Sequence, residues 1–336
     1  ADVIEEILRI YGYNNIKSSS KINQSVRLEK VNLKDKLTNS VANQLVSLGF
    51  HEIMTNSLIS NKENGLNKDE LEYKNVDIIN FSSIEQSQLR NSLIFSGLNT
   101  IKHNINRKNS DLKLFEFGKE YFLDKESYIE NEKLVIFIHG NKNKNNWNSK
   151  EVKSDFYFLK GVVKSITDKI GFSNLKNKPI SSNNIQEGES LFFNKSEMVK
   201  YGILNSTICN QLEIESSVYY AEFDMNNILK NSFNKPILYK KISKFPVVSR
   251  DLSILIDDNI KYEKIHNAVR QINMKLIKEV SLFDVYKGDK LPENKKSYGI
   301  AFKILDNEKT LSEEIIEELM DKIISKLKKE FEAELR

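Results

Sequence analysis

The sequence predicts an α+β protein in which a mainly antiparallel sheet with helices against it is followed by a second domain of βαββαβ order. Up to residue 240, strand-like and helix-like segments alternate with unequal spacing, without the regular βαβ repeat of a parallel sheet. Beyond residue 240 the order of the elements becomes regular. Hydrophobic residues make up 39% of the 336 residues, enough to form buried cores, but no apolar run approaches the ~20 residues of a membrane span.

The first part of the chain is predicted from apolar spacing. Residues 1–12 have the three- and four-residue spacing of a helix that ends at Gly12, and the polar residues 17–24 have the composition of a linker. The segments that follow are helices at 28–48, 89–106 and 156–170, strands at 52–59, 76–81, 112–122, 134–139, 198–204 and 218–223, and an exposed loop at 141–150.

The second part follows the order strand, helix, strand, strand, helix, strand. Its expected segments are strands at 250–256, 280–286, 298–305 and 333–336, with helices at 262–274 and 312–331. This is the split-βαβ, or ferredoxin-like, arrangement. Thr310 and Glu313 have the spacing of a capping box at the start of the last helix.

Composition limits the possible functions. The chain has 51 basic and 47 acidic residues, a formal charge of +4, which argues against a non-specific nucleic-acid coat and requires any RNA contact to be local. Its one cysteine, Cys209, cannot form an internal disulfide or a cysteine-based zinc site, which favours a reducing compartment, the cytoplasm. The opening residues include no initiator methionine and no signal-type stretch, so we expect a longer protein to have been cut before Ala1.

Several catalytic motifs are absent from the sequence. No P-loop, dinucleotide-binding GxGxxG or GxSxG motif occurs, no motif surrounds Cys209, and the four histidines are scattered. No arginine lies between Lys108 and Ser249. Because sites that clamp a triphosphate usually use the bidentate arginine fork, the middle of the chain is a poor candidate for nucleotide chemistry.

Three carboxylates near the N-terminus form the first candidate site. Asp2, Glu5 and Glu6 stand at i, i+3 and i+4, so a helix can bring them to one side. Together they suit a hard cation such as Mg²⁺. The alternative is a solvated acidic helix start, which the helix dipole favours.

The strand at 280–286 carries the second candidate site. Alternation places Leu282, Asp284 and Tyr286 on one sheet face, with Phe283 and Val285 towards the helices. A carboxylate acceptor beside an aromatic ring can bind a base edge and stack a base. The alternative is a strand-end tyrosine beside a solvated aspartate. Lysines near these strands add a weak positive bias; they are Lys287, Lys295, Lys296 and Lys303.

Landmarks spread along the chain resemble one family. The runs Lys244-Phe-Pro-Val-Val-Ser-Arg250-Asp251-Leu-Ser, Leu282-Phe-Asp-Val-Tyr286-Lys-Gly288, Lys295-Lys-Ser-Tyr298 and Thr310-Leu-Ser are similar to the ferredoxin-fold anticodon-binding domain of the bacterial phenylalanine–tRNA synthetase beta subunit. Leu48-Gly-Phe-His-Glu52, Leu89-Arg-Asn-Ser-Leu93 and Leu114-Phe-Glu-Phe-Gly118 resemble its catalytic-like domain, and residues 1–16 resemble the end of the preceding domain.

The resemblance implies a domain plan and a function. Residues 1–20 would end a magnesium-ligand domain and its linker, 21–240 would form a class II synthetase-like domain without catalytic residues, and 243–336 would bind the anticodon. The chain would pair with the alpha subunit, as two alpha and two beta, while alpha uses ATP to attach phenylalanine to tRNA(Phe); no membrane is involved. The editing and OB-fold domains of the family would precede Ala1.

The resemblance also implies roles for individual residues. Asp2, Glu5 and Glu6 match a family Mg²⁺ site associated with the alpha subunit, for which a further ligand would precede Ala1. Asp284 and Tyr286 match anticodon contacts, and Arg250 and Lys287 are further RNA-binding candidates.

Two functions from other classes stay open. The chain could be a stand-alone RNA-binding or interaction protein with a borrowed ferredoxin-like domain, or an amino-acid-binding regulatory enzyme with such a sensor domain. For a subunit interface we expect the helix at 89–106, through an apolar stripe whose alternative role is core packing. That stripe consists of Leu93, Ile94, Leu98, Ile101 and Ile105.

Overall fold

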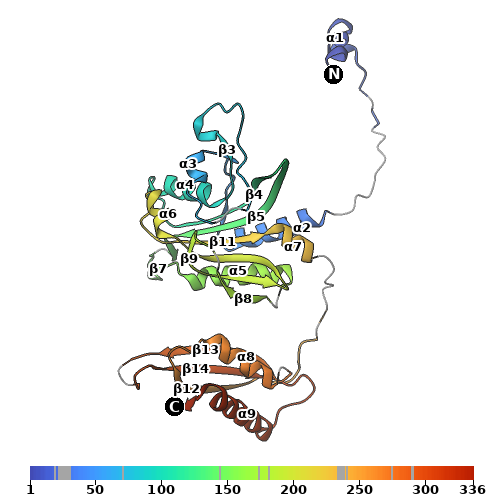
Figure 1. The fold of residues 1–336 in the computed structure, drawn as a ribbon. Helices are drawn as coiled ribbons and strands as arrows, with labels where there is room; N and C mark the ends of the chain where they lie inside the picture. Colours follow the sequence, from blue (N-terminus) through green and yellow to red (C-terminus); the bar gives the residue numbers. More distant parts are fainter. Residues whose placement is uncertain are drawn as a thin grey trace. The chain divides into compact units, whose positions relative to one another are not determined.

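The structure is a computed structural model, in which the chain forms two compact units, residues 1–235 and 236–336 (Figure 1). Each unit is described by itself. The structure describes residues 1–18, 20–21, 32–69, 72–143, 145–172, 175–180, 182–232, 239, 241–273, 275–288 and 291–336.

A seven-stranded sheet organises the first unit, in the order β1-β4-β5-β11-β10-β9-β8. Its strands are β1 (His51–Glu52), β4 (Leu112–Asp124), β5 (Ser127–His139), β8 (Lys176–Pro179), β9 (Ile185–Phe193), β10 (Ser196–Leu204) and β11 (Val218–Asp224). Only the β1–β4 pair is parallel, so the mainly antiparallel sheet is confirmed. Two short pairs accompany it, β2 (Leu58–Ile59) with β3 (Gln88–Leu89), and β6 (Asn141–Asn143) with β7 (Val152–Lys153).

Helices cover both faces of this sheet (Figure 1). Besides the three-residue turns η1 (Tyr13–Asn15) and η2 (Ile84–Gln86), the unit has α1 (Asp2–Tyr11), α2 (Leu33–Ser47), α3 (Asn61–Asn64), α4 (Ile94–Ile105), α5 (Phe156–Ile170), α6 (Ser206–Gln211) and α7 (Met225–Ser232). The boundaries of α5 have clear local causes: Asp155 accepts a hydrogen bond from the Phe158 backbone N–H, and Gly171 ends the helix at a φ of 92°.

Alternation along the strands separates two cores. Leu134, Ile136 and Ile138 of β5 pack under α2, α5 and α7, whereas Val135 and Phe137 pack under α4 and α6. The same strands therefore contribute to both cores, with alternate residues of a strand pointing into opposite cores.

Several predicted segments of this unit were wrong. The strand expected at 52–59 is two short strands, β1 and β2, and residues 76–81 form only an isolated bridge, between Asp77 and Gln88. Strand β5 begins at Ser127, because the β4–β5 hairpin continues through polar residues to a two-residue turn at Lys125 and Glu126. The β6–β7 pair lies inside the expected loop, and β9 was missed because its pattern is largely polar.

The helix expected at 89–106 starts only at Ile94, since Leu89 belongs to β3. Its stripe is not an interface: Leu93, Ile94, Leu98 and Ile101 are at most 1% exposed, inside this unit's own core. The interface prediction for these side chains was therefore wrong. The predicted helix at 28–48 is seen as α2; residues 28–31 lie outside the described residues.

The second unit has the predicted βαββαβ order. Its elements are β12 (Val248–Asp257), α8 (Tyr262–Ile272), β13 (Ile277–Tyr286), β14 (Lys295–Ile304), α9 (Glu313–Phe331) and β15 (Glu334–Leu335). The four strands form one antiparallel sheet in the order β13-β14-β12-β15. Both helices pack on one face of it, in a core that includes Ile254, Val269, Ile300 and Ile323. The expected capping box is absent, since Ser312 is the N-cap residue and makes no side-chain capping bond.

Candidate nucleic-acid interface

The sheet of the second unit has a face opposite its two helices, which we call the open face. On β14, Tyr298 and Ile300 are buried in the core, so the residue between them, Gly299, points to the open face. Asp284 is in register with Gly299, and Tyr286 with Ser297. The structure therefore brings Asp284 and Tyr286 together on the open face.

A β-bulge changes the expected pattern beside these residues. The register of β13 against β14 shifts between Leu282 and Asp284, so Phe283 has no partner across the pair. A Cβ on Gly299 would lie 2.8 Å from two ring atoms of Phe283, so this ring lies over Gly299 on the open face. The expectation that Phe283 faces the helices was wrong. The expectation that Leu282 shares a face with Asp284 and Tyr286 was also wrong, because Leu282 is in register with Ile300 and packs against the core.

Tyr286 is supported on several sides. Its ring centroid lies 5.3 Å from the guanidinium carbon of Arg336, a cation–π distance. A Cβ on Gly288 would lie 3.0 Å from the Tyr286 hydroxyl, so the chain turns closely around the end of the ring. The side chain is half-buried, whereas Asp284 beside it is exposed.

Most cations near these strands are already paired. Lys287 lies 2.5 Å from Asp258, Lys303 lies 2.8 Å from Glu279, and Lys295 lies 2.5 Å from Glu334. The hydrogen bond from Lys287 lowers the pKa of Asp258. These pairs offset the positive bias seen in the sequence.

Arg250 lies away from the other candidates. It is in register with the buried Phe302, which places it on the helix side of the sheet, and it pairs with Glu313 of α9. Lys296 donates to the Asp258 carbonyl and lies 4.9 Å from the centroid of the Tyr298 ring. By contrast, Asp284, Tyr286 and Phe283 lie together on the open face; the position of Phe283 was not predicted from the sequence.

The first unit carries a buried ion pair on the sheet face that meets α4. Arg90 and Glu116 are each 2% exposed and lie 3.0 Å apart. The Arg90 guanidinium also donates to the Thr55 hydroxyl at 2.7 Å and to the Lys119 carbonyl at 2.9 Å. The Thr55 hydroxyl in turn donates to Glu116 at 2.6 Å. Arg90 is thus held within the protein by a carboxylate, a hydroxyl and a carbonyl.

Further along the same face, two lysines are surrounded by carboxylates. Lys133 lies 3.0 Å from Asp224 and 3.4 Å from Glu222, and Lys200 lies 3.3 Å from Glu222. Burial, together with the negative charge of the nearby Glu222, raises the pKa of Glu120 to about 8. For Glu222 itself, burial opposes ionisation, but Lys200 and Lys133 lower its pKa to about 2. The two lysines thus face Glu222 and Asp224, with Asp69 at the edge of the cluster, 4.0 Å from Lys200, so among the described residues no cation is left to Glu120 alone.

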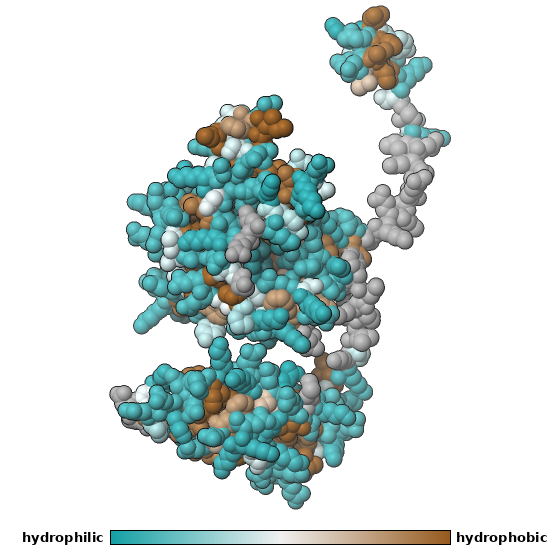
Figure 2. Space-filling model, viewed as in Figure 1, coloured by the Kyte–Doolittle hydropathy of each residue, from teal (hydrophilic) through white to brown (hydrophobic). Residues whose placement is uncertain are grey.

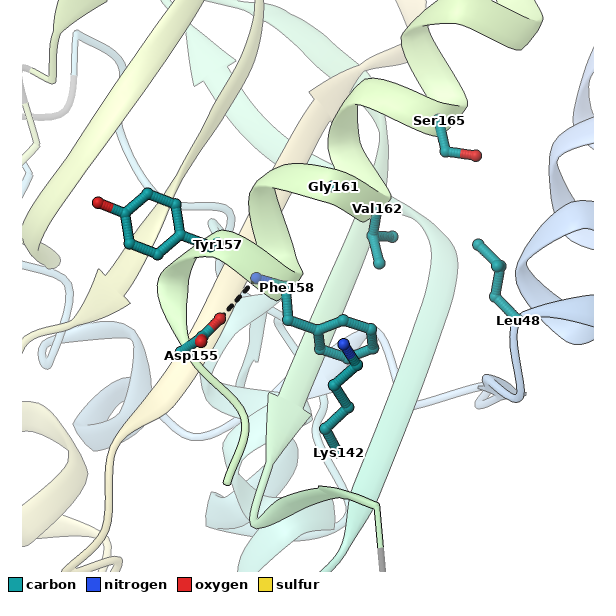
Figure 3. Close-up of a pocket in the computed structure, with 8 residues that line it drawn as sticks. All are labelled: Leu48, Lys142, Asp155, Tyr157, Phe158, Gly161, Val162 and Ser165. Atoms are coloured by element: carbon teal, nitrogen blue, oxygen red, sulfur yellow. Dashed lines mark hydrogen bonds between the residues drawn. The ribbon is translucent and has the colours of Figure 1, made fainter. Parts of the chain in front are cut away.

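A cavity of about 370 Å³ lies where the end of α2, the start of α5 and β6 meet. Figure 3 shows the Lys142 amine against the Phe158 ring, 5.0 Å from its centroid, with Leu48 facing Val162 across the cavity. Its one carboxylate, Asp155, caps α5. Its lining is mainly apolar and presents no nucleophile paired with a base, so we assign it no chemistry.

The N-terminal carboxylates lie on α1, a helix without a buried residue. Glu6 pairs with Arg9 at 3.0 Å. Among the described residues, no three histidine, cysteine, aspartate or glutamate side chains converge in a way that could hold a metal ion. Asp2, Glu5 and Glu6 thus offer an acidic surface but not a complete set of ligands. Figure 2 shows the apolar side chains of the same helix gathered in a stripe; they include Val3, Ile4, Ile7 and Ile10.

Two further expectations can be set against the structure. Cys209 is buried, and burial raises the pKa of its thiol to about 11, which disfavours the reactive thiolate. Within the described part of the chain, no helix is both long enough and apolar enough to cross a bilayer.

Comparison with known proteins adds the following. Residues 19–225 match the family model described as phenylalanyl tRNA synthetase beta chain CLM domain, and residues 243–336 match the ferredoxin-fold anticodon binding domain. The whole chain is 35% identical to the phenylalanine–tRNA ligase beta subunits of Bacteroides thetaiotaomicron and Bacteroides fragilis, and it spans 42% of the length of each. Among solved structures, pyrrolysyl-tRNA synthetase from Desulfitobacterium hafniense matches with a TM-score of 0.47 at 13% identity, covering 58% of this chain and 68% of that one.

Proposed function

Because the chain belongs to the phenylalanyl-tRNA synthetase beta chain family, we propose that it is a non-catalytic part of phenylalanine–tRNA ligase. In this role it pairs with an alpha subunit, in an assembly of two alpha and two beta subunits in the cytoplasm, and binds the anticodon region of tRNA(Phe). The alpha subunit uses ATP to attach phenylalanine. Asp284 and Tyr286 side by side on the open face are the observation that carries the tRNA-binding role.

The open face can read a base without many phosphate contacts. The Tyr286 ring offers a stacking surface, and the Asp284 carboxylate accepts hydrogen bonds from the amino and imino groups of a base edge. Lys287, already paired with Asp258, contributes at the edge of this site, and Arg250 on the helix side is the weakest of the four RNA-binding candidates.

The first unit suits a scaffold. A site for adenylyl transfer needs cations that are free to hold the triphosphate. Arg90, Lys133 and Lys200 are instead bound by carboxylates of the same sheet face. We therefore place ATP on the partner subunit and assign this chain no catalytic residue.

A Mg²⁺ site has less support in the structure than the tRNA-binding site. Asp2, Glu5 and Glu6 supply hard oxygen ligands at helical spacing, but they do not converge by themselves, and Glu6 is paired with Arg9. An ion held there takes further ligands from outside these three residues, such as the partner subunit. No step of the proposed function depends on it.

Binding of tRNA(Phe) by the 336-residue chain tests the proposal. We expect Tyr286→Ala to weaken binding by about 1–3 kcal/mol, the range for removing one stacking ring, and a tRNA altered only in its anticodon to lose a similar amount. Tyr157→Ala, at a tyrosine that is 78% exposed in the first unit, is the matched control and should bind as the wild type does. Equal, weak binding in every case would exclude anticodon recognition.

Assembly separates the proposal from its two rivals. Mixed with the alpha subunit, the chain should elute as a larger complex in size-exclusion chromatography with light scattering. A chain that stays alone yet binds RNA at full strength would favour a stand-alone RNA-binding protein. A chain that stays alone and gains thermal stability from a free amino acid would favour the regulatory enzyme.

A further inference from the structure

We propose that Phe283 is a second nucleobase-stacking surface on the open face, beside Tyr286, so that two bases of a single-stranded RNA segment bind with Asp284 between the two rings. This inference rests on the proposed function and deepens it, since it assigns a further recognition residue. Its basis is the bulge in β13 and Gly299 beneath the Phe283 ring.

The position of Phe283 is set by the bulge. Because Phe283 has no partner on β14, its side chain need not alternate in direction with those of its neighbours along β13. Its ring comes to lie over Gly299, where a Cβ would stand 2.8 Å from two ring atoms. Any residue other than glycine at position 299 would therefore displace the ring from the sheet.

Phe283 is the more accessible of the two rings. Its side chain is 59% exposed, although a phenylalanine ring has no polar group and could be buried without losing a hydrogen bond to water. The half-buried Tyr286 ring is already covered in part by Arg336. Among the ring pairs of the described residues, none joins Phe283 to Tyr286, so the two rings act as separate surfaces.

The chemistry of the open face favours bases over phosphates. Asp284 lies between the rings and repels a phosphate, but it accepts hydrogen bonds from base edges. Lys303 and Lys295, the lysines of β14 on this face, are held by Glu279 and Glu334. A β-sheet face that offers few free cations usually binds single-stranded RNA by stacking bases on aromatic rings.

The test uses a fluorescently labelled anticodon stem-loop of tRNA(Phe) and the whole 336-residue chain. Affinities are measured by anisotropy for the wild type, Phe283→Leu, Gly299→Ala and Tyr286→Leu. Val285→Ala is the matched control, because Val285 is 55% exposed on the same strand but in register with Tyr298 on the helix side. A second set of stem-loops carries one abasic nucleotide at each anticodon position.

We expect Phe283→Leu to weaken binding roughly 5- to 150-fold, the loss of one stacked base. Gly299→Ala, which keeps the ring but displaces it, should also weaken binding, and Val285→Ala should leave it unchanged. The Phe283 variant should become insensitive to an abasic nucleotide at one position, and the Tyr286 variant at a different one. Circular dichroism and thermal melting check that each variant is folded.

The contrary outcomes separate the two proposals. Unchanged binding by Phe283→Leu with weakened binding by Tyr286→Leu would overturn the inference and leave the proposed function standing. Insensitivity of both variants to the same abasic position would also overturn it, because both rings would then serve one base. Wild-type affinity in both variants would overturn the tRNA-binding role in the proposed function.

Discussion

Removing the buried guanidinium of Arg90 should destabilise the first unit more than any surface change. In Arg90→Met an apolar, unbranched side chain replaces the aliphatic stem of the arginine, but the guanidinium that pairs with Glu116 is gone. Glu116 is 2% exposed and keeps only its contacts with the Thr55 hydroxyl and backbone N–H. A buried carboxylate then remains without a positive charge beside it.

The magnitude follows from the contacts that are lost. Arg90 gives up hydrogen bonds at 2.7, 2.9 and 3.0 Å, one of them to a charged group. Breaking a buried ion pair by removing one partner typically costs about 3–5 kcal/mol, and we expect a value in that range. The double variant Arg90→Met, Glu116→Leu should cost less than Arg90→Met alone, since it leaves no buried charge and only the smaller penalty of unpaired neutral groups.

Hydrogen exchange measured by mass spectrometry, peptide by peptide, is the suitable assay. It gives the opening free energy of β4 and β5 separately, while the peptides of β12 and β14 in the second unit act as an internal reference. Thr100→Ala, which removes a half-buried hydroxyl on α4, is the control for a loss of stability that any substitution in this unit would cause. A loss below about 1 kcal/mol in Arg90→Met, or a double variant that costs the sum of the two single ones, would refute the reasoning.

Two further predictions concern pH and salt. The pKa of Glu120 is about 8 in the folded chain and near its ordinary value of 4.5 when the chain is unfolded, so between these pH values the unfolded state releases a proton that the folded state keeps. The stability of the first unit should therefore fall as pH rises from about 5 to 8, by up to about 1.4 kcal/mol per pH unit. Urea unfolding at several pH values should show this slope flattened in Glu120→Gln, and an unchanged slope would contradict the assignment. Because the lysines near the open face are paired with carboxylates, binding of the stem-loop should depend only weakly on salt. The logarithm of the association constant should fall by less than about 2 for a tenfold increase in salt concentration. A fall of more than about 4 would indicate phosphate contacts and contradict the expectation.

The second unit was predictable from sequence because its signals are local and agree with one another. Strands β12 and β14 alternate, each helix carries an apolar stripe, and the order of elements allows one simple arrangement. The first unit was less predictable where the chain departs from such patterns. Strand β9 is largely polar because it lies near the sheet edge, and the stripe of α4 is filled by the unit's own core. Periodicity identifies an apolar face but not what covers it.

The charged cluster of the first unit shows a different limit. Lys133, Glu120 and Glu222 come from three strands, and no spacing in the sequence connects them. Only the register of the antiparallel sheet brings them together. Pairing of this kind depends on long-range contacts, which local patterns do not report.

The open face shows how a prediction can be right for an incomplete reason. Strict alternation from the buried Val280 and Leu282 would have turned Asp284 and Tyr286 towards the helices, where a carboxylate and a hydroxyl would need partners. The bulge at Phe283 adds one residue and reverses the alternation beyond it, so both side chains reach the open face. The same extra residue carries the Phe283 ring onto Gly299. One irregularity in β13 thus supplies all three side chains of the proposed RNA site, and sequence periodicity alone could not have located it.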